Sequence, residues 1–142
     1  MLEALQLSLA PSALVGFLVY MIGAIALLAA FKVVYTRITP HREYELIRSG
    51  NVAAAIALSG AIIGFALPTS NIIANSVSLL DFVVWSFIAG AVQLAAFYVV
   101  SRVIKDLPER IKNNDLAAAI YVAAVSISIG MLNAACMTPS AA

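Results

Sequence analysis

Residues 45–56 read ELIRSGNVAAAI, and residues 109–120 read ERIKNNDLAAAI. Both stretches pass from charged to wholly apolar, and their first residues, Glu45 and Glu109, lie 64 positions apart. Asn51 and Asp115 suit a helix N-cap, because a short polar side chain accepts a hydrogen bond from a free backbone N–H group. We therefore expect a long apolar helix to begin at each of these two points.

The composition is that of a membrane protein. Hydrophobic residues make up 63% of the chain and charged residues 11%, whereas a soluble domain is about half apolar and a quarter charged. Four stretches carry no Asp, Glu, Lys or Arg, and each can hold the roughly 20 apolar residues that a membrane-spanning helix needs. The sequence predicts transmembrane helices at about 12–32, 51–68, 80–102 and 115–137.

These spans define one all-α, polytopic transmembrane domain over residues 1–142. We predict a first helical hairpin at about 12–68, an outer connection at about 69–80, and a second hairpin at about 80–137. Since each hairpin crosses twice, both have the same orientation, and the repeated junction indicates two parallel repeats. Convergent composition is the alternative, because any junction between cytoplasm and membrane places charges before apolar residues.

The positions of the basic residues predict the orientation. All eight Lys and Arg residues lie at or in the two connections that follow the first and third spans. Positive residues in short loops mark the cytoplasmic side, so both termini are expected outside, in the periplasm of a bacterial host. The first span is expected to remain as an anchor, because its only preceding charged side chain is Glu3, whereas a signal peptide begins with positive charge.

Longer stretches carry a family resemblance. The segments are TPHREYELI, GNVAAAIALSGAIIGFALP, NSVSLLDFVVW, QLAAF and NAACMT. With them the chain resembles the YjfL-type bacterial inner-membrane proteins, known as domain of unknown function 350, over about residues 14–138. The resemblance implies a four-span inner-membrane protein with two related halves, and it implies no reaction.

Small residues are dense in the second span. Small side chains at four-residue spacing let helix backbones approach closely in lipid. The set comprises Ala53, Ala57, Gly60, Ala61 and Gly64. These residues are expected to serve either helix packing within one protomer or an interface between copies of the chain.

A few polar side chains fall inside the spans. Gln93 and Ser126 are both expected near mid-depth, with Ser59 slightly closer to the inner side, and these three are candidates for interhelical hydrogen bonds or a pore lining. Asn133, near the outer end of the last span, is expected to cap the helix or make an outer contact. Asp81 is expected to cap the third span, with an external cation site as the alternative.

No catalytic or metal site is predicted. The only histidine, His41, and the only cysteine, Cys136, are expected at opposite ends of the bilayer, too far apart to act together. We therefore expect no cofactor and no enzymatic activity. Whether Cys136 crosslinks protomers stays open.

The inner loops form a basic rim with interleaved acidic residues. Its expected role is topogenic charge with lipid headgroup contact, or docking of a cytoplasmic protein, and its small excess of charge disfavours nucleic acid. The rim comprises Arg37, Arg42, Arg48, Lys105, Arg110 and Lys112. We predict a homo-oligomeric structural or partner-recruiting component of the envelope; the alternative is a small oligomeric channel or transporter.

Overall fold

The computed structural model describes residues 1–40 and 42–137, and all its regular elements in these residues are α-helices. Four are long and apolar enough to cross a membrane: α2 (Pro11–Ile38), α4 (Val52–Asn75), α5 (Leu79–Val103) and α7 (Leu116–Cys136). Three short helices accompany them, namely α1 (Leu2–Ser8), α3 (Glu43–Arg48) and α6 (Leu107–Lys112). The predicted all-α fold with four candidate transmembrane helices is confirmed. His41 lies outside the described residues.

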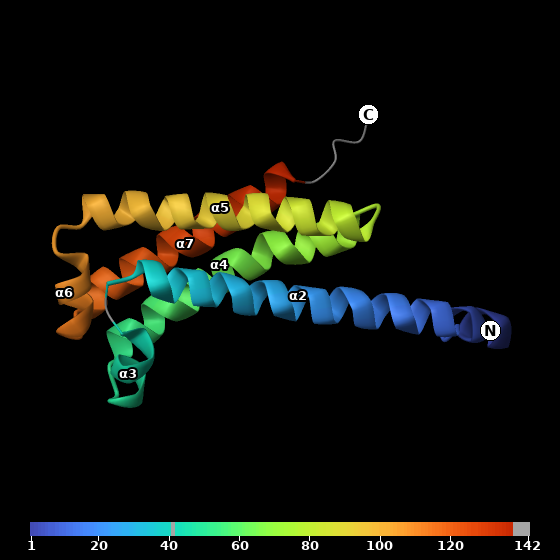
Figure 1. The fold of residues 1–142 in the computed structure, drawn as a ribbon, viewed down its shortest axis with the longest axis horizontal. Coiled ribbons are helices and arrows are strands. Elements are labelled where there is room, and N and C mark those ends of the chain that lie inside the picture. Colours follow the sequence, from blue (N-terminus) through green and yellow to red (C-terminus); the bar gives the residue numbers. More distant parts are fainter. Residues whose placement is uncertain (41, 138–142) are drawn as a thin grey trace.

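The short helices α3 and α6 lie at the same end of the molecule (Figure 1). We call this the junction end. The opposite end holds the α4–α5 connection and the N-terminus, and we call it the connection end. Because α3 joins α2 to α4 and α6 joins α5 to α7, helices α4 and α7 both run from the junction end towards the connection end.

The core is built around α4 and α7, which share the most extensive contact between any two helices. Helix α5 packs against both of them, while α2 packs against α4 and α5. On α4 eleven residues are buried, but on α2 only Phe31 and Tyr35 are. Helix α2 is therefore a peripheral helix whose surface is mostly left to lipid or to another protein.

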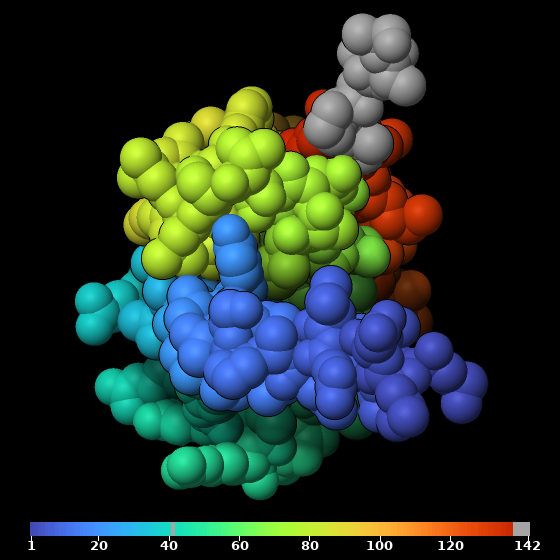
Figure 2. Space-filling view, turned by 90° about the vertical axis from the view of Figure 1, so that its right-hand side faces the viewer, coloured from blue at the N-terminus to red at the C-terminus, as the bar shows by residue number. Residues whose placement is uncertain are grey.

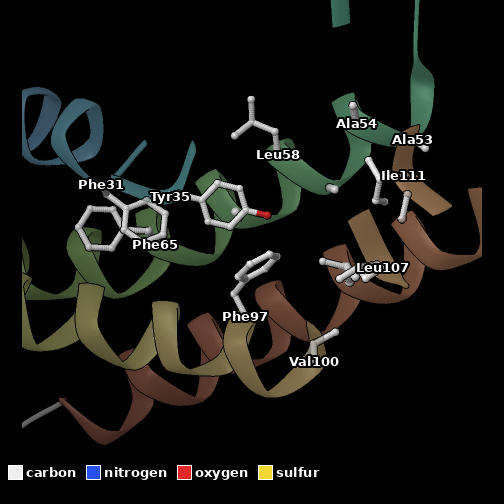
Figure 3. Packing of buried hydrophobic residues seen from close by; sticks show 14 of the residues in the cluster. Phe31, Tyr35, Ala53, Ala54, Leu58, Phe65, Phe97, Val100, Leu107 and Ile111 are labelled. Atoms are coloured by element: carbon white, nitrogen blue, oxygen red, sulfur yellow. The ribbon is translucent and has the colours of Figure 1, made fainter. Parts of the chain in front are cut away.

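Aromatic rings hold α2 in place. Phe31 stacks on Phe65 of α4 with ring centroids 4.4 Å apart, and Tyr35 meets the ring of Phe97 on α5 edge-on at 4.9 Å (Figure 3). A third contact, between Tyr20 and Phe82, has its centroids 5.5 Å apart. N-terminal to Tyr20, helix α2 extends past the α4–α5 connection. Figure 2 shows this extension end-on in blue, beside the yellow-green atoms of that connection.

The connection between α4 and α5 is much shorter than predicted. Helix α4 continues through Pro68 to Asn75, so only residues 76–78 separate it from α5, instead of residues 69–80. Proline removes one backbone N–H donor, but the next turn is stabilised here in other ways. Thr69 donates from its hydroxyl to the Phe65 carbonyl at 2.8 Å, and Ile72 is buried in the core.

Candidate functional site

The two junctions adopt the same local geometry at a constant spacing of 64 residues. After α3, Asn51 N–H donates to the Leu46 carbonyl at 2.9 Å; after α6, Asp115 N–H donates to the Arg110 carbonyl at 2.9 Å. The residue before each of these two caps has a positive φ, 89° at Gly50 and 59° at Asn114. Glycine and asparagine are the residues that adopt this conformation most readily, so the two turns are locally equivalent.

Each cap works as predicted. The Asn51 side chain accepts from the Ala54 N–H at 2.9 Å, and the Asp115 side chain accepts from the Ala118 N–H at 3.2 Å. Both side chains therefore satisfy one of the free N–H groups at a helix start.

The junctions also bond to one another. The Asn51 Nδ2 group donates to the carbonyls of Ile111 and Lys112 at 2.9 and 3.1 Å, so it closes the end of α6 while its oxygen caps α4. In return, Ala53 N–H donates to Oδ1 of Asn114 at 2.9 Å. Sequence reasoning missed this role of Asn114, although its alignment with Gly50 indicated a positive φ. The exchange ties the starts of α4 and α7 together at the junction end.

Gln93 and Ser126 meet inside the bundle. The buried Gln93 Nε2 donates to the Ser126 backbone carbonyl at 2.7 Å, and Gln93 Oε1 has no hydrogen-bond partner in the described part of the chain. Gly64 makes room for this bond, because a Cβ at Gly64 would overlap the Gln93 amide and crowd the Ser126 carbonyl. The structure thus brings Gln93 and Ser126 together, through the backbone carbonyl of Ser126 and not through its hydroxyl.

The other candidate polar residues lie elsewhere. Ser59 is exposed on α4, whereas Gln93 and Ser126 are buried, so the three do not line one interior surface within the protomer. Asn133 is buried and its Nδ2 donates to the Ala89 carbonyl on α5 at 3.3 Å. It is thus an interhelical contact near the connection end.

The small residues of α4 pack inside the protomer. The whole predicted set is buried, namely Ala53, Ala57, Gly60, Ala61 and Gly64. A Cβ at Gly60 would overlap the backbone of Ala123 on α7, so α4 and α7 approach to backbone contact there. This placement agrees with the reading in which they serve packing within one protomer.

Every residue of the basic rim is exposed at the junction end. Three of the six form ion pairs: Arg42 with Glu45 at 2.9 Å, Arg110 with Asp115 at 2.7 Å, and Lys112 with Glu109 at 2.9 Å. The other three make no ion pair within residues 1–40 and 42–137, and they are Arg37, Arg48 and Lys105. The rim therefore carries unpaired positive charge at the junction end.

Two acidic residues have structural positions of note. Glu43, one of the acidic residues interleaved with the basic rim, is buried in the first turn of α3. Asp81 does not cap α5, because Ser78 does, accepting from the Asp81 N–H at 3.1 Å. The Asp81 carboxylate accepts from the Val77 N–H at 3.2 Å, in a reciprocal arrangement close to a capping box. Asp81 therefore serves to fix the short connection.

The remaining chemistry-bearing side chain is Cys136, which is exposed at the end of α7. In the described residues no group of three or more His, Cys, Asp or Glu side chains could hold a metal ion.

Comparison with known proteins places the chain in a family. The family model described as Domain of Unknown Function (DUF350) matches residues 8–137. The chain belongs to this family. It is 37% identical over 125 residues to the UPF0719 inner membrane protein YjfL of Escherichia coli K12, covering 88% of this chain and 95% of that protein. It is 27% identical to the UPF0719 transmembrane protein YshE of Bacillus subtilis, covering 86% of this chain and 92% of that protein.

No solved structure matches the chain. The family membership and the four apolar helices identify an integral, multi-pass protein of the inner membrane.

Proposed function

We propose that this protein is a non-enzymatic, homo-oligomeric component of the envelope that recruits a cytoplasmic protein through its junction end. Both termini and the α4–α5 connection face the periplasm in this proposal, and α3 and α6 face the cytoplasm. The supporting observation is the gathering of all eight Lys and Arg residues in and around the two junctions, where cytoplasmic loops carry such residues.

The unpaired cations define the surface that a partner would contact. Arg37 lies in the last turn of α2, Arg48 ends α3 and Lys105 lies in the connection between α5 and α6, so three separate segments present exposed cations at the junction end. Five carboxylates lie in the same region, so eight cations exceed them by three. This modest excess suits an acidic protein surface better than a nucleic acid, whose binding needs many phosphate contacts.

The test neutralises the unpaired cations and keeps the paired ones. A photocrosslinking amino acid at the exposed residue Ser49 would be activated in living cells in the native background. The matched variants are Arg37→Gln, Arg48→Gln and Lys105→Gln together, and the charge-preserving Arg37→Lys, Arg48→Lys and Lys105→Arg together. In a Cys136→Ala background, which removes the exposed native thiol, a thiol introduced by Val77→Cys and labelled from the periplasm checks that neither variant inverts the chain.

We expect a discrete protein adduct that the charge-preserving variant keeps and the neutral variant loses. Adducts to lipid alone, or a protein adduct indifferent to neutralisation, would overturn the recruiting role. A monomer in native mass spectrometry from nanodiscs would overturn the oligomeric part.

A further inference from the structure

Helices α4 and α7 contact one another through different faces. Gly60 of α4 lies against Ala123 of α7, Gly64 lies against Ser126, and the Asn71 side chain of α4 donates to the Ala134 carbonyl at 2.6 Å. We call the contacting surface of α4 its front face, which comprises the buried residues Ala53, Ala57, Gly60, Gly64 and Pro68. The contacting surface of α7 is its back face, which comprises Ala119, Ala123, Ser126, Gly130 and Ala134.

The constant spacing of the two junctions gives each face an equivalent on the other helix. Position 51 corresponds to position 115, a difference of 64, so the front face of α7 is found by adding 64 to that of α4. It comprises Ala117, Tyr121, Ala124, Ser128 and Leu132, all exposed. The back face of α4 is found by subtracting 64 from that of α7, and comprises Ala55, Ser59, Ile62, Ala66 and Ser70.

On each helix, the residues of the front face and those of the back face differ by about two positions in the sequence. Two positions correspond to about 200° of rotation about the helix axis, so the two faces lie on opposite sides. The back face of α4 is partly accessible: Ser59 and Ser70 are exposed, and the other three residues are half-buried. A groove of about 190 Å³ lies between its far part, at Ala66 and Ser70, and α2. Each protomer thus uses the front face of α4 and the back face of α7, leaves the front face of α7 exposed, and covers the back face of α4 only in part.

The composition of these two remaining faces favours protein over lipid. Alanine and serine predominate in both, as they do where transmembrane helices pack. The outward surface of α5 carries bulky apolar side chains instead, including exposed Val84, Phe87, Ile88 and Val99, which suit lipid chains. The same protein therefore has one outer surface shaped for lipid and two that resemble its own internal contact.

From these relationships we propose that the front face of α7 docks on the back face of α4 in a second copy of this chain. The contact repeats, between copies, the arrangement that joins α4 to α7 within one copy. It joins two different surfaces, so it is heterologous, and successive copies form a closed ring if their rotation allows. This proposal rests on the proposed homo-oligomer and specifies its interface.

The contact between copies is looser than the one within a copy. Ala124 and Ser128 take the places of Gly60 and Gly64, and Ala66 takes the place of Gly130. These positions gain Cβ atoms exactly where the internal contact has none, so the backbones stay further apart. The oligomer should accordingly dissociate in detergent before the protomer unfolds.

Cysteine pairs test the geometry directly. In a Cys136→Ala background, Ser59→Cys and Ala124→Cys are placed on separate chains that are expressed together. Ser59 lies seven residues after Val52 and Ala124 eight after Leu116, so both thiols sit about 10–12 Å from the junction end. Oxidation with copper phenanthroline in native membranes should crosslink Ser59→Cys to Ala124→Cys, while neither variant alone crosslinks to itself. Val99→Cys with Ala124→Cys is the matched control and should not crosslink.

Self-crosslinking of either single variant would show a symmetric interface and overturn the proposal. Absence of the mixed crosslink, with an oligomer present by native mass spectrometry, would overturn the interface and leave the oligomer standing. A monomer would overturn both. As an independent measurement, Ala124→Trp should abolish the oligomer while helicity is retained, whereas Val99→Trp should leave it intact; an intact Ala124→Trp oligomer contradicts the proposal.

Discussion

Gly130 of α7 packs directly on the backbone carbonyl of Gly64 in α4, with no room for a Cβ between them. Pro68, four residues after Gly64, has no N–H to donate to that carbonyl, so the helix leaves one acceptor without its usual partner at the point of closest approach. The two helices that begin at equivalent junctions thus meet by backbone contact in the interior of the bundle.

Replacing Gly130 by alanine should destabilise the protomer by about 2 kcal/mol or more, because the added methyl group overlaps backbone that cannot rotate away. Gly16→Ala in α2 is the matched control, since nothing lies within 4 Å of a Cβ there. The measurement is reversible unfolding in mixed micelles. Equal unfolding midpoints for the two variants would show that α4 and α7 do not meet as described.

Replacing Gln93 by leucine should change the stability of the protomer by less than about 1 kcal/mol. The lost hydrogen bond to Ser126 is worth about 0.6 kcal/mol in a membrane, and removal of the unpaired Oε1 offsets part of it. Gln93→Ala should cost more than Gln93→Leu, because it leaves a cavity. If Gln93→Leu proves the more damaging of the two in the same unfolding assay, the polar group itself is required.

Asn51 should contribute through both ends of its amide. Asn51→Ala loses the cap on Ala54 and the bonds to the α6 carbonyls, at a cost of about 1–2 kcal/mol. Asn51→Asp keeps the acceptor for Ala54 but loses the Nδ2 donor, so its unfolding midpoint should lie between those of the alanine variant and the native chain. An aspartate variant as stable as the native chain would show that the bonds between the junctions contribute nothing.

Asp115 should make stability depend on pH in acid. The hydrogen bond from Arg110, together with that from the Ala118 N–H, holds the pKa of the Asp115 carboxyl below its usual range. An unfolded aspartate has a pKa of about 3.9, so this contribution is complete about one pH unit above that value, decreases below it, and is lost as pH falls through the lower native pKa. Asp115→Asn keeps the cap on α7 but removes the negative charge. The difference in unfolding free energy between this variant and the native chain, measured in mixed micelles, should therefore become smaller as the pH falls. A pH-independent difference would contradict this.

The spans and junctions could be predicted from the sequence because charge and its absence mark the membrane boundaries directly. The Asn51 and Asp115 caps followed from their position between charged and apolar residues. The rotation of each helix about its axis could not be predicted, because a span that is apolar all round has no polar face to mark the lipid side. Ser59 and Gln93 were therefore grouped, although the fold separates them.

Two other differences have local causes. The second span was predicted to end at about residue 68, but the Thr69 hydroxyl and the burial of Ile72 let α4 continue to Asn75. Glu43 belongs to a charged junction, yet it is buried because α3 turns its first residue inwards.

The central claim is that the chain crosses the membrane four times with both junctions on the cytoplasmic side. Ser49 and Asn113 are both exposed and occupy equivalent positions 64 residues apart, so single cysteines there form a matched pair in a Cys136→Ala background. A membrane-impermeant maleimide should label Ser49→Cys and Asn113→Cys only in inverted vesicles, and Val77→Cys only in cells with a permeabilised outer membrane. Labelling of Ser49→Cys and Asn113→Cys from opposite sides would contradict the four-span arrangement.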